Sequence, residues 1–467
     1  MAEGLEYFSL KIFAVSPDHR YIAVGYDQNG SERLILKILD TTQNTYLPLE
    51  LDNISSNGLV WKTDSSGFYF QTVDENWRSN QVYYYDFKAH LDGKSPSPLL
   101  IFKEEDATNH VGISRSTDTH HMLIDVSDPK DNVTHVIDLD TPEHSLYTPI
   151  PRKTNIKYDM GSAGADWIIM TTDQGANKRL LMIPKNAAQP ADLDKAYEIA
   201  PYHKHDPLVD FNVYQTHVVY SGKHDGVPFL KIWDRATKTT RVVELGMESF
   251  TLSLAQQEYA QPFCRVHVSN LITPGQTMHI DLKTGDPAII KQRDVPNFHS
   301  TDYVTRRHSA PAPDGVQIPY TIAYKKGTDL STAPTYLYGY GSYGYPTEPN
   351  FRATFLPLMN KGYVVVLGHI RGGSDLGRAW YEAAKLKTKI KTFTDFISIA
   401  EDMIKRNIAQ KGNITIAGGS AGGMLVGAVV NMRPDLFQSV VAMVPFVDVL
   451  NTMMDGSLPL TPGEYHE

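Results

Sequence analysis

Residues 413–432 read NITIAGGSAGGMLVGAVVNM, and this stretch decides the fold of the C-terminal part of the chain. The run NITIA is typical of a buried strand, and the alanine- and valine-rich run after the glycines has the length of a helix. Gly418-x-Ser420-x-Gly422 lies at their junction, which is the context of a nucleophile elbow. The pattern predicts Ser420 on a sharp strand-to-helix turn, and the alternative is a serine in an ordinary glycine-rich turn.

Apolar runs bounded by glycine or proline surround this stretch. They read YTIAYKK, APTYLYGYG, GYVVVLGHI and SVVAMVP, and such runs are typical of buried, mostly parallel strands. Between the third and fourth runs, KTFTDFISIAEDMIKRNIA places its apolar residues on one helical face. Residues 299–467 are therefore predicted to form an α/β-hydrolase type of domain with a mostly parallel sheet, incomplete at its C-terminal side.

The first 298 residues follow a different pattern of short alternating strands split by turn residues. Recognisable units begin near residues 14, 59, 111, 159, 210 and 258, a spacing of about 45 to 52 residues. That spacing is the period of four-stranded propeller blades, and a β-sandwich does not repeat over such a length. We predict a β-propeller over residues 1–298, with the domain boundary in the polar, proline-bearing stretch 295–315.

The composition indicates a soluble globular protein of 467 residues, with 41% hydrophobic residues, 21% charged residues and a net charge of −9. This charge disfavours nucleic acid as a partner, because no basic stripe is present, and it suits a cationic substrate. The N-terminus has no apolar signal core and no run is long enough to span a membrane. With Cys264 as the single cysteine, we expect a cytoplasmic protein without disulfides.

Residues 335–346, TYLYGYGSYGYP, raise the question of a dinucleotide site, because Gly339-x-Gly341-x-x-Gly344 has the spacing of that fingerprint. The fingerprint also needs a helix directly behind the glycines and an acid after the next strand. Pro346 and Pro349 block the helix, and the next strand ends in glycine and histidine. We therefore expect no nucleotide cofactor, and a tyrosine of this loop is a candidate donor to an oxyanion opposite the elbow.

The segments YGYGSYG, HIRGGSDLG, GGSAGG, NMRPDLF and VPFVDVLNTMMDGSLPLTPGEY together resemble the prolyl oligopeptidase family of serine peptidases, and within it the oligopeptidase B group. The likeness covers nearly the whole chain and implies a seven-bladed propeller in front of an α/β-hydrolase domain. It implies that Ser420 is the nucleophile. It also implies that the Tyr340 hydroxyl shares the oxyanion with the backbone N–H of Ala421.

The same resemblance implies hydrolysis of small peptides after Arg or Lys, with Glu464, Glu348 and Tyr343 as substrate-binding residues. Two positions depart from the family pattern, because His466 and Asn350 stand where further acids are expected. A carboxylate pairs a guanidinium through two hydrogen bonds, so the loss of partners should weaken the basic preference without inverting it.

Three polar residues of HIRGGSDLG, namely His369, Arg371 and Asp375, lie near the active site in this family. A structural hydrogen-bond network that holds the glycine-rich loop is at least as good an interpretation for each of them. Asp448 follows the strand after the elbow and is not a candidate for the triad acid. No metal site is expected, because the histidines are scattered.

The order of triad residues in this fold is serine, aspartate, histidine. After Ser420 the sequence contains one histidine, His466, which lies in the segment that the resemblance assigns to substrate binding. We therefore expect a fragment truncated at both ends, without the triad acid and base and inactive by itself. Two other functions stay open, a non-catalytic propeller that binds other molecules and a family member that cleaves after proline.

Overall fold

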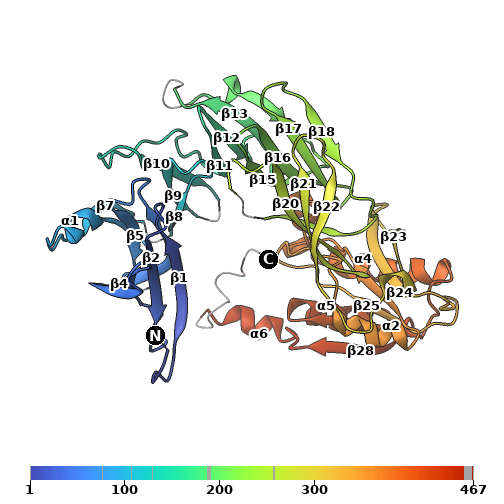
Figure 1. Cartoon of the computed structure of the whole chain (residues 1–467). Helices are drawn as coiled ribbons and strands as arrows, with labels where there is room; N and C mark the ends of the chain where they lie inside the picture. Colours follow the sequence, from blue (N-terminus) through green and yellow to red (C-terminus); the bar gives the residue numbers. More distant parts are fainter. Residues whose placement is uncertain are drawn as a thin grey trace.

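The computed structural model combines a series of antiparallel sheets with a mixed sheet flanked by helices (Figure 1). It describes residues 2–75, 77–106, 108–128, 130–186, 191–255, 258–456, 465 and 467. The last strand of the first part ends at Gln292, and the first strand of the second part begins at Tyr303. A propeller followed by an α/β domain, as predicted from the sequence, is therefore confirmed.

The described residues of the first part form five antiparallel sheets. The first sheet comprises β1 (Ser9–Val15), β2 (Tyr21–Asp27), β3 (Leu34–Asp40), β4 (Thr45–Trp61), β5 (Phe68–Thr72), β6 (Gln81–Tyr85) and β7 (Leu99–Lys103), with α1 (Phe87–Leu91) before its last strand. The second comprises β8 (His110–Arg115), β9 (His121–Ser127) and β10 (Asn132–Asp138), and the third β11 (Tyr158–Ala163), β12 (Asp166–Thr171), β13 (Arg179–Pro184) and β14 (Tyr197–Ala200). The last two comprise β15 (Leu208–Val213), β16 (His217–His224), β17 (Val227–Asp234) and β18 (Thr240–Val243), then β19 (Thr251–Leu254), β20 (Phe263–Asn270), β21 (Thr273–Asp281) and β22 (Pro287–Gln292).

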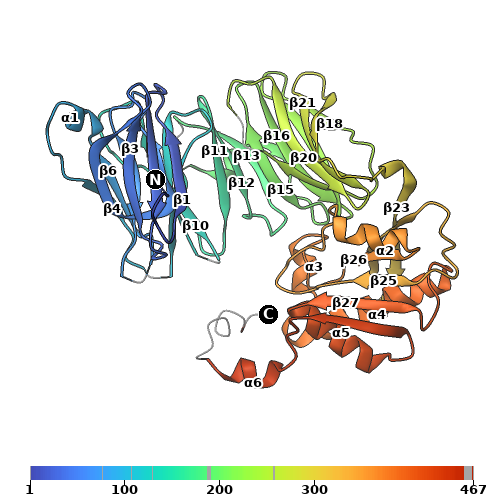
Figure 2. The same cartoon turned by 60° about the horizontal axis from the view of Figure 1, so that its bottom comes forward.

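The first sheet contains two propeller units joined by one long strand. β4 has 17 residues, because its first half pairs with β3 and its second half pairs with β5. The sheets follow one another in an arc, and β1 lies at the opposite end of the arc from β22 (Figures 1 and 2). The described residues therefore form six units, and the seventh blade implied by the resemblance stays a prediction.

One turn recurs at the end of the third strand of three units. Asp40, Asp234 and Asp281 each accept hydrogen bonds from backbone N–H groups two and three residues later, at 2.8 to 3.2 Å. An aspartate replaces the backbone carbonyl in such a turn and fixes the reversal between two strands. The repeat read from the sequence thus has a chemical marker at each of these turns.

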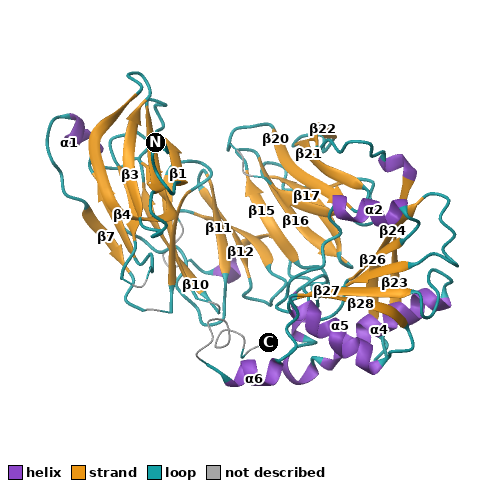
Figure 3. Ribbon diagram, turned by 90° about the horizontal axis from the view of Figure 1, so that it is seen from below, coloured by secondary structure: helices purple, strands orange, loops and turns teal. Residues whose placement is uncertain are grey.

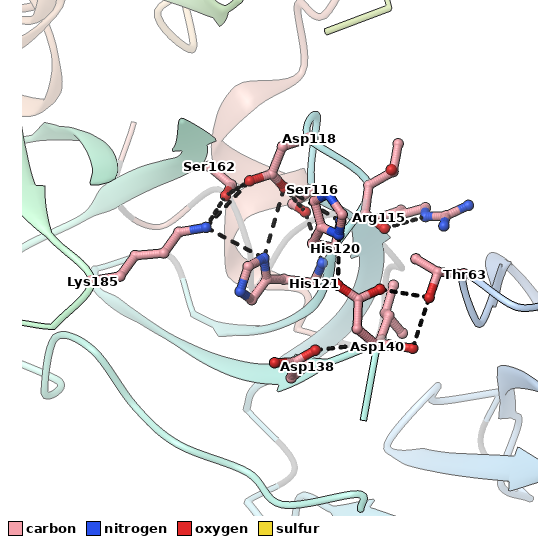
Figure 4. Close-up of polar contacts among 12 residues, drawn as sticks. Thr63, Arg115, Ser116, Asp118, His120, His121, Asp138, Asp140, Ser162 and Lys185 are labelled. Carbon is pink, nitrogen blue, oxygen red and sulfur yellow. Dashed lines mark hydrogen bonds and ion pairs between the residues drawn. The ribbon is translucent and has the colours of Figure 1, made fainter. Parts of the chain in front are cut away.

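A buried ionic cluster joins the third propeller unit to the fourth (Figure 4). Asp118, in the turn between β8 and β9, accepts hydrogen bonds from Ser116 at 2.6 Å and from Ser162 on β11. Lys185, which follows β13, places its Nζ 3.2 Å from Asp118 Oδ2 and 2.5 Å from Ser162 Oγ. The same ammonium lies 4.4 Å from the centre of the Trp167 ring, so it has an aromatic face as well as a carboxylate.

The contacts of Asp118 decide its charge. Burial by itself raises the pKa of this carboxyl, but hydrogen bonds from His121, Ser116 and Ser162 and the charge of Lys185 outweigh it and hold the pKa well below the usual range. The group is therefore ionised in the folded protein at every ordinary pH. Burial in turn lowers the pKa of Lys185, and the charge of Asp118 opposes that effect.

The second part is a six-stranded sheet in the order β23-β24-β26-β25-β27-β28. The strands are β23 (Tyr303–Pro311), β24 (Gln317–Lys325), β25 (Thr335–Tyr338), β26 (Val364–Gly368), β27 (Ile414–Gly419) and β28 (Phe437–Met443). The helices are α2 (Leu356–Asn360), α3 (Arg378–Glu382), α4 (Ile390–Lys405), α5 (Ala421–Met432) and α6 (Val449–Met454). Pairs from β26 to β28 are parallel and the first two pairs are antiparallel, so the predicted mostly parallel sheet is present.

Both faces of the central strands are covered by helices. Val364 and Val366 of β26 pack with residues of α4 and α5, whereas Val365 and Leu367 pack with residues of α2. Figures 2 and 3 show α2 on the opposite side of the sheet from α4 and α5. The last strand, β28, is the edge of this sheet and exposes most of its side chains.

The two parts bond to each other through the last two propeller sheets. The Ser249 hydroxyl lies 2.9 Å from the Thr321 hydroxyl on β24, and both side chains are buried. The backbone N–H of Phe351 donates to Ser269 Oγ on β20 at 3.1 Å. The loop that follows β25 is therefore held directly against the propeller.

The cluster around Asp118 generates a stability prediction. In Asp118→Asn the Lys185 ammonium stays buried without its counter-ion, so we expect the free energy of unfolding of the propeller to fall by about 3 kcal/mol. Urea unfolding followed by tryptophan fluorescence measures this change. Asp159→Asn, which breaks the exposed pair with Lys178, serves as the control and should cost less than about 0.5 kcal/mol.

The contribution of Asp118 to the free energy of unfolding depends on pH with a defined sign. Because the pKa of Asp118 is lowered in the folded state, its contribution is present above the unfolded pKa and is lost as pH falls through the folded value. The stability gap between wild type and Asp118→Asn should stay constant down to about pH 4 and narrow below it. A gap that widens on acidification contradicts this assignment.

Candidate active site

Ser420 lies at a strained corner between β27 and α5. Its backbone has φ 55° and ψ −119°, a conformation that side-chain-bearing residues rarely adopt and that is typical of a nucleophile elbow. The Ser420 N–H donates to Met443 O on β28, and the Phe446 N–H donates to Ser420 O, both at 2.9 Å. These bonds fix the corner on both sides, while the serine side chain is exposed.

Glycines at the elbow allow the close approach of backbone segments. A Cβ atom on Gly418 would lie 2.0 Å from Gly422 O, so no larger residue fits there. A Cβ atom on Gly422 would lie 2.9 Å from Gly339 O and 3.3 Å from Tyr340 Cδ2. The start of α5 therefore packs directly on the loop that carries Tyr340.

The parallel pairing of β25 with β27 brings Tyr340 to Ser420. Tyr338 lies opposite Ala417 in this pair, and the Gly339 N–H donates to Ala417 O at 3.2 Å. Burial, with neighbouring tyrosines and Glu467 adding to it, raises the pKa of Tyr340, while a hydrogen bond with the Ser420 side chain acts in the opposite direction. The tyrosine side chain therefore lies near the Ser420 side chain, at the same corner as the start of α5.

Ala421 provides the second donor predicted for an oxyanion. It is the first residue of α5, and the first N–H groups of a helix have no acceptor within the helix. Such a group at a helix N-terminus attracts negative charge. The corner thus combines a hydroxyl nucleophile, a backbone N–H beside it and a tyrosine hydroxyl opposite it, which is an arrangement suited to acyl transfer.

The loop after Tyr340 contains two further candidate residues. Tyr343 has φ 57°, its ring centre lies 6.4 Å from that of Tyr340, and its backbone N–H donates to the carboxylate of Glu467. Glu348 is half-buried, and its Oε1 lies 2.8 Å from Nζ of Lys223 on β16. The carboxylate predicted to meet a basic substrate side chain therefore already pairs with a lysine of the propeller.

The remaining substrate-binding candidate, Glu464, and the neighbouring His466 lie outside the described residues. Asn350, which stands in place of an expected acid, accepts a hydrogen bond from Thr251 Oγ1 at 2.7 Å. A cavity of 510 Å³ lies between the propeller and residues 339–352, which follow β25 and are called the tyrosine loop below. Its lining includes Glu348, Asn350, Lys223 and Thr251. Asn350, one of the two departures from the family pattern, thus lies at the interface between the domains.

The polar residues of HIRGGSDLG form a buried network. His369 Nδ1 lies 3.0 Å from Asp375 Oδ1, and its Nε2 lies 2.8 Å from Thr321 Oγ1. Arg371 forms ion pairs at 2.6 Å with Asp395 on α4 and with Asp314. His369, Arg371 and Asp375 are at most 5% exposed, which favours the structural interpretation of all three. Sequence analysis did not single out Asp395, because it lies away from the helical face formed by Phe393 and Ala400.

Several other site classes can be judged from the described residues. No helical residue occurs between the end of β25 and the 3₁₀ turn Ala353–Phe355, so the glycines of the tyrosine loop do not lead into a helix as a dinucleotide site requires. In the part of the chain that the structure describes, no three His, Cys, Asp or Glu side chains come together as metal ligands would. Among the described helices, none combines the length and the apolar character needed to cross a membrane.

The triad is not completed by the residues described after Ser420. Residues 421–456, 465 and 467 contain no histidine. The carboxylate of Asp448, which is not a candidate for the triad acid, accepts hydrogen bonds from the side-chain amide of Asn451. The described site therefore contains the predicted nucleophile and the predicted oxyanion donors.

Known proteins resemble this chain over its whole length. Residues 1–293 match the prolyl oligopeptidase N-terminal β-propeller domain, and residues 349–467 match the prolyl oligopeptidase family. Dipeptidyl aminopeptidase BI of Pseudoxanthomonas mexicana is 33% identical over 475 residues, which cover 100% of this chain and 64% of that protein. Protease 2 of Moraxella lacunata is 32% identical and covers 100% of this chain and 67% of its own length. The chain spans about two thirds of the length of these curated relatives.

Solved structures agree with this relationship. Oligopeptidase B from Leishmania major superimposes with a TM-score of 0.83 at 31% identity, covering 100% of this chain and 66% of that one. Oligopeptidase B from Trypanosoma brucei, solved in a closed form with covalently bound antipain, gives the same TM-score, identity and coverage. The chain belongs to the prolyl oligopeptidase family of serine peptidases.

Proposed function

We propose that this protein contributes the propeller and the nucleophile of a peptidase that cleaves small peptides after Arg or Lys, as an oligopeptidase B does. The observation that carries the proposal is that the pairing of β25 with β27 packs Tyr340 against the first turn of α5, directly beside Ser420 at a strained elbow. The propeller restricts access to short unstructured peptides. We expect the protein to work in the cytoplasm and to need no cofactor.

In the proposed reaction the Ser420 hydroxyl attacks the carbonyl carbon of the scissile bond and gives its proton to the triad base. The base passes the proton to the leaving amine as the C–N bond breaks, and an acyl-enzyme remains. The carbonyl oxygen becomes an oxyanion and accepts hydrogen bonds from the Ala421 N–H and the Tyr340 hydroxyl. Because burial raises the pKa of Tyr340, this hydroxyl keeps its proton at neutral pH and remains a donor. Water then hydrolyses the acyl-enzyme.

A serine needs a base to accept its proton and an acid to orient that base. We propose that the aspartate and histidine of the triad lie outside these 467 residues, so that this chain is inactive by itself. The coding sequence downstream of Glu467 should then contain an aspartate followed by a histidine. If the isolated 467-residue chain hydrolyses peptides and loses that activity when one of its own histidines is replaced, this part of the proposal is wrong.

Glu348 by itself attracts a basic side chain only weakly, because Lys223 already neutralises it. A basic side chain that binds Glu348 has to displace that lysine. We therefore propose a weak basic preference that depends mainly on Glu464. A dipeptidyl aminopeptidase is among the relatives, so release of dipeptides from a free N-terminus is a second candidate activity.

The catalytic roles are tested by substitution in a polypeptide extended by the downstream coding sequence. Ser420→Ala should abolish labelling by a fluorophosphonate probe and should reduce peptide hydrolysis to background. Tyr340→Phe removes one oxyanion donor and should lower kcat by about 100-fold with little change in KM. No probe labelling and no peptide hydrolysis by the unsubstituted polypeptide would instead favour a non-catalytic propeller that binds other molecules.

The substrate class is tested with peptide amides that differ only in the residue before the scissile bond. Arginine and lysine amides should be hydrolysed fastest, and Glu348→Gln should change the ratio of kcat/KM values by less than about threefold, because Lys223 occupies that carboxylate. A proline preference rules out the basic assignment. Faster hydrolysis of dipeptide amides with a free amino group than of their blocked forms would identify the aminopeptidase activity.

A further inference from the structure

Lys389 is a cation that the proposed reaction does not use. It directly precedes α4, and its side chain is 17% exposed. Its Nζ lies 2.9 Å from Gly341 O, 2.6 Å from Ser342 Oγ and 3.4 Å from Glu467 Oε1. An ammonium has three donors, and each of them has an acceptor here.

Two of these acceptors belong to the residues directly after Tyr340. On the other side of Tyr340, the Gly339 N–H is held by Ala417 O in the sheet. Tyr340 therefore lies between two fixed points, one set by strand pairing and the other by the lysine. Without Lys389, Gly341 and Ser342 would lose their hydrogen bonds to the ammonium.

The backbone at Gly341 packs closely against Thr392 and Gly372. Gly341 has φ 70°, and a Cβ atom on it would lie 2.4 Å from Thr392 Cγ2. A Cβ atom on Gly372 would lie 2.1 Å from Gly341 O. Thr392 Oγ1 is 3.4 Å from the same oxygen, so Lys389 provides the shorter hydrogen bond at 2.9 Å.

Glu467 forms a further hydrogen bond with the same loop. Its carboxylate accepts hydrogen bonds from the Tyr343 N–H and from the Tyr381 hydroxyl, the latter at 2.8 Å. Lys389 is the cation that faces this half-buried carboxylate at 3.4 Å. Removing the lysine charge would thus leave Glu467 without this counter-ion and weaken its hold on the Tyr343 N–H.

We propose that Lys389 is a positioning residue, which orders residues 341–343 and thereby aims the Tyr340 hydroxyl at the oxyanion. The catalytic part of this inference rests on the proposed function. The ordering part does not, because it concerns the loop in the absence of substrate. The two parts are therefore tested by separate measurements.

Hydrogen exchange of the 467-residue chain tests the ordering. In Lys389→Met, amides of the segment 338–346 should exchange about tenfold faster or more, because local opening becomes easier. Propeller amides should be unchanged. Lys387→Met is the matched control, since Lys387 is exposed and lies two residues earlier. Equal exchange of this segment in the two variants overturns the proposal.

Steady-state kinetics of the extended polypeptide tests the catalytic role. Lys389→Met should lower kcat by about 10- to 100-fold, since misplacement by a fraction of an ångström is costly, and should leave KM within about twofold. If the lysine acts through Tyr340, the double variant Lys389→Met, Tyr340→Phe should be no slower than Tyr340→Phe. A general structural defect would instead multiply the two losses.

The outcomes separate the two proposals. Multiplied losses, with the expected loss in Tyr340→Phe, contradict the positioning role and leave the peptidase assignment intact. A normal rate in both Ser420→Ala and Tyr340→Phe contradicts the proposed function and the catalytic role of Lys389 together. The exchange measurement then still decides whether Lys389 orders the loop.

Discussion

The parallel pairing of β25 with β27 is the constraint on which the rest of the site depends. Because Tyr338 lies opposite Ala417, the loop after one strand and the elbow after the other emerge at the same edge of the sheet. Gly422 then lets the two backbones approach until the tyrosine ring packs against the first turn of α5. A shift of this register by one residue would turn Tyr340 to the other face of the sheet and separate the two hydroxyls.

Charge around the tyrosine loop is arranged on two sides. The α4 side provides Lys389 and Glu467, which contact the residues after Tyr340. The propeller side provides Lys223, which pairs with Glu348 inside the cavity between the domains. The loop that carries the oxyanion donor is therefore bound to both domains, and a movement of the propeller relative to the sheet would act on it directly.

The sequence predicted the features that local rules or repeats encode. The elbow at Ser420 follows from a strand, glycines and a helix in immediate succession. The propeller follows from short alternating strands whose units recur about every 45 to 52 residues. The proximity of Tyr340 came from resemblance, because strand order in a sheet is not written in local periodicity. The Glu348–Lys223 pair joins residues 125 positions apart, so no local pattern could indicate it. Lys389 was missed because it lies in a lysine-rich run with no apolar periodicity to single it out.

A crystal structure of the extended polypeptide with a peptidyl-arginine aldehyde bound to Ser420 tests the central claim most directly. The account predicts that the hemiacetal oxygen lies about 3 Å from both the Tyr340 hydroxyl and the Ala421 N. It also predicts that Lys389 keeps its contacts with Gly341 and Ser342. An oxygen that points away from Tyr340, or an aldehyde attached to a residue other than Ser420, would contradict the account.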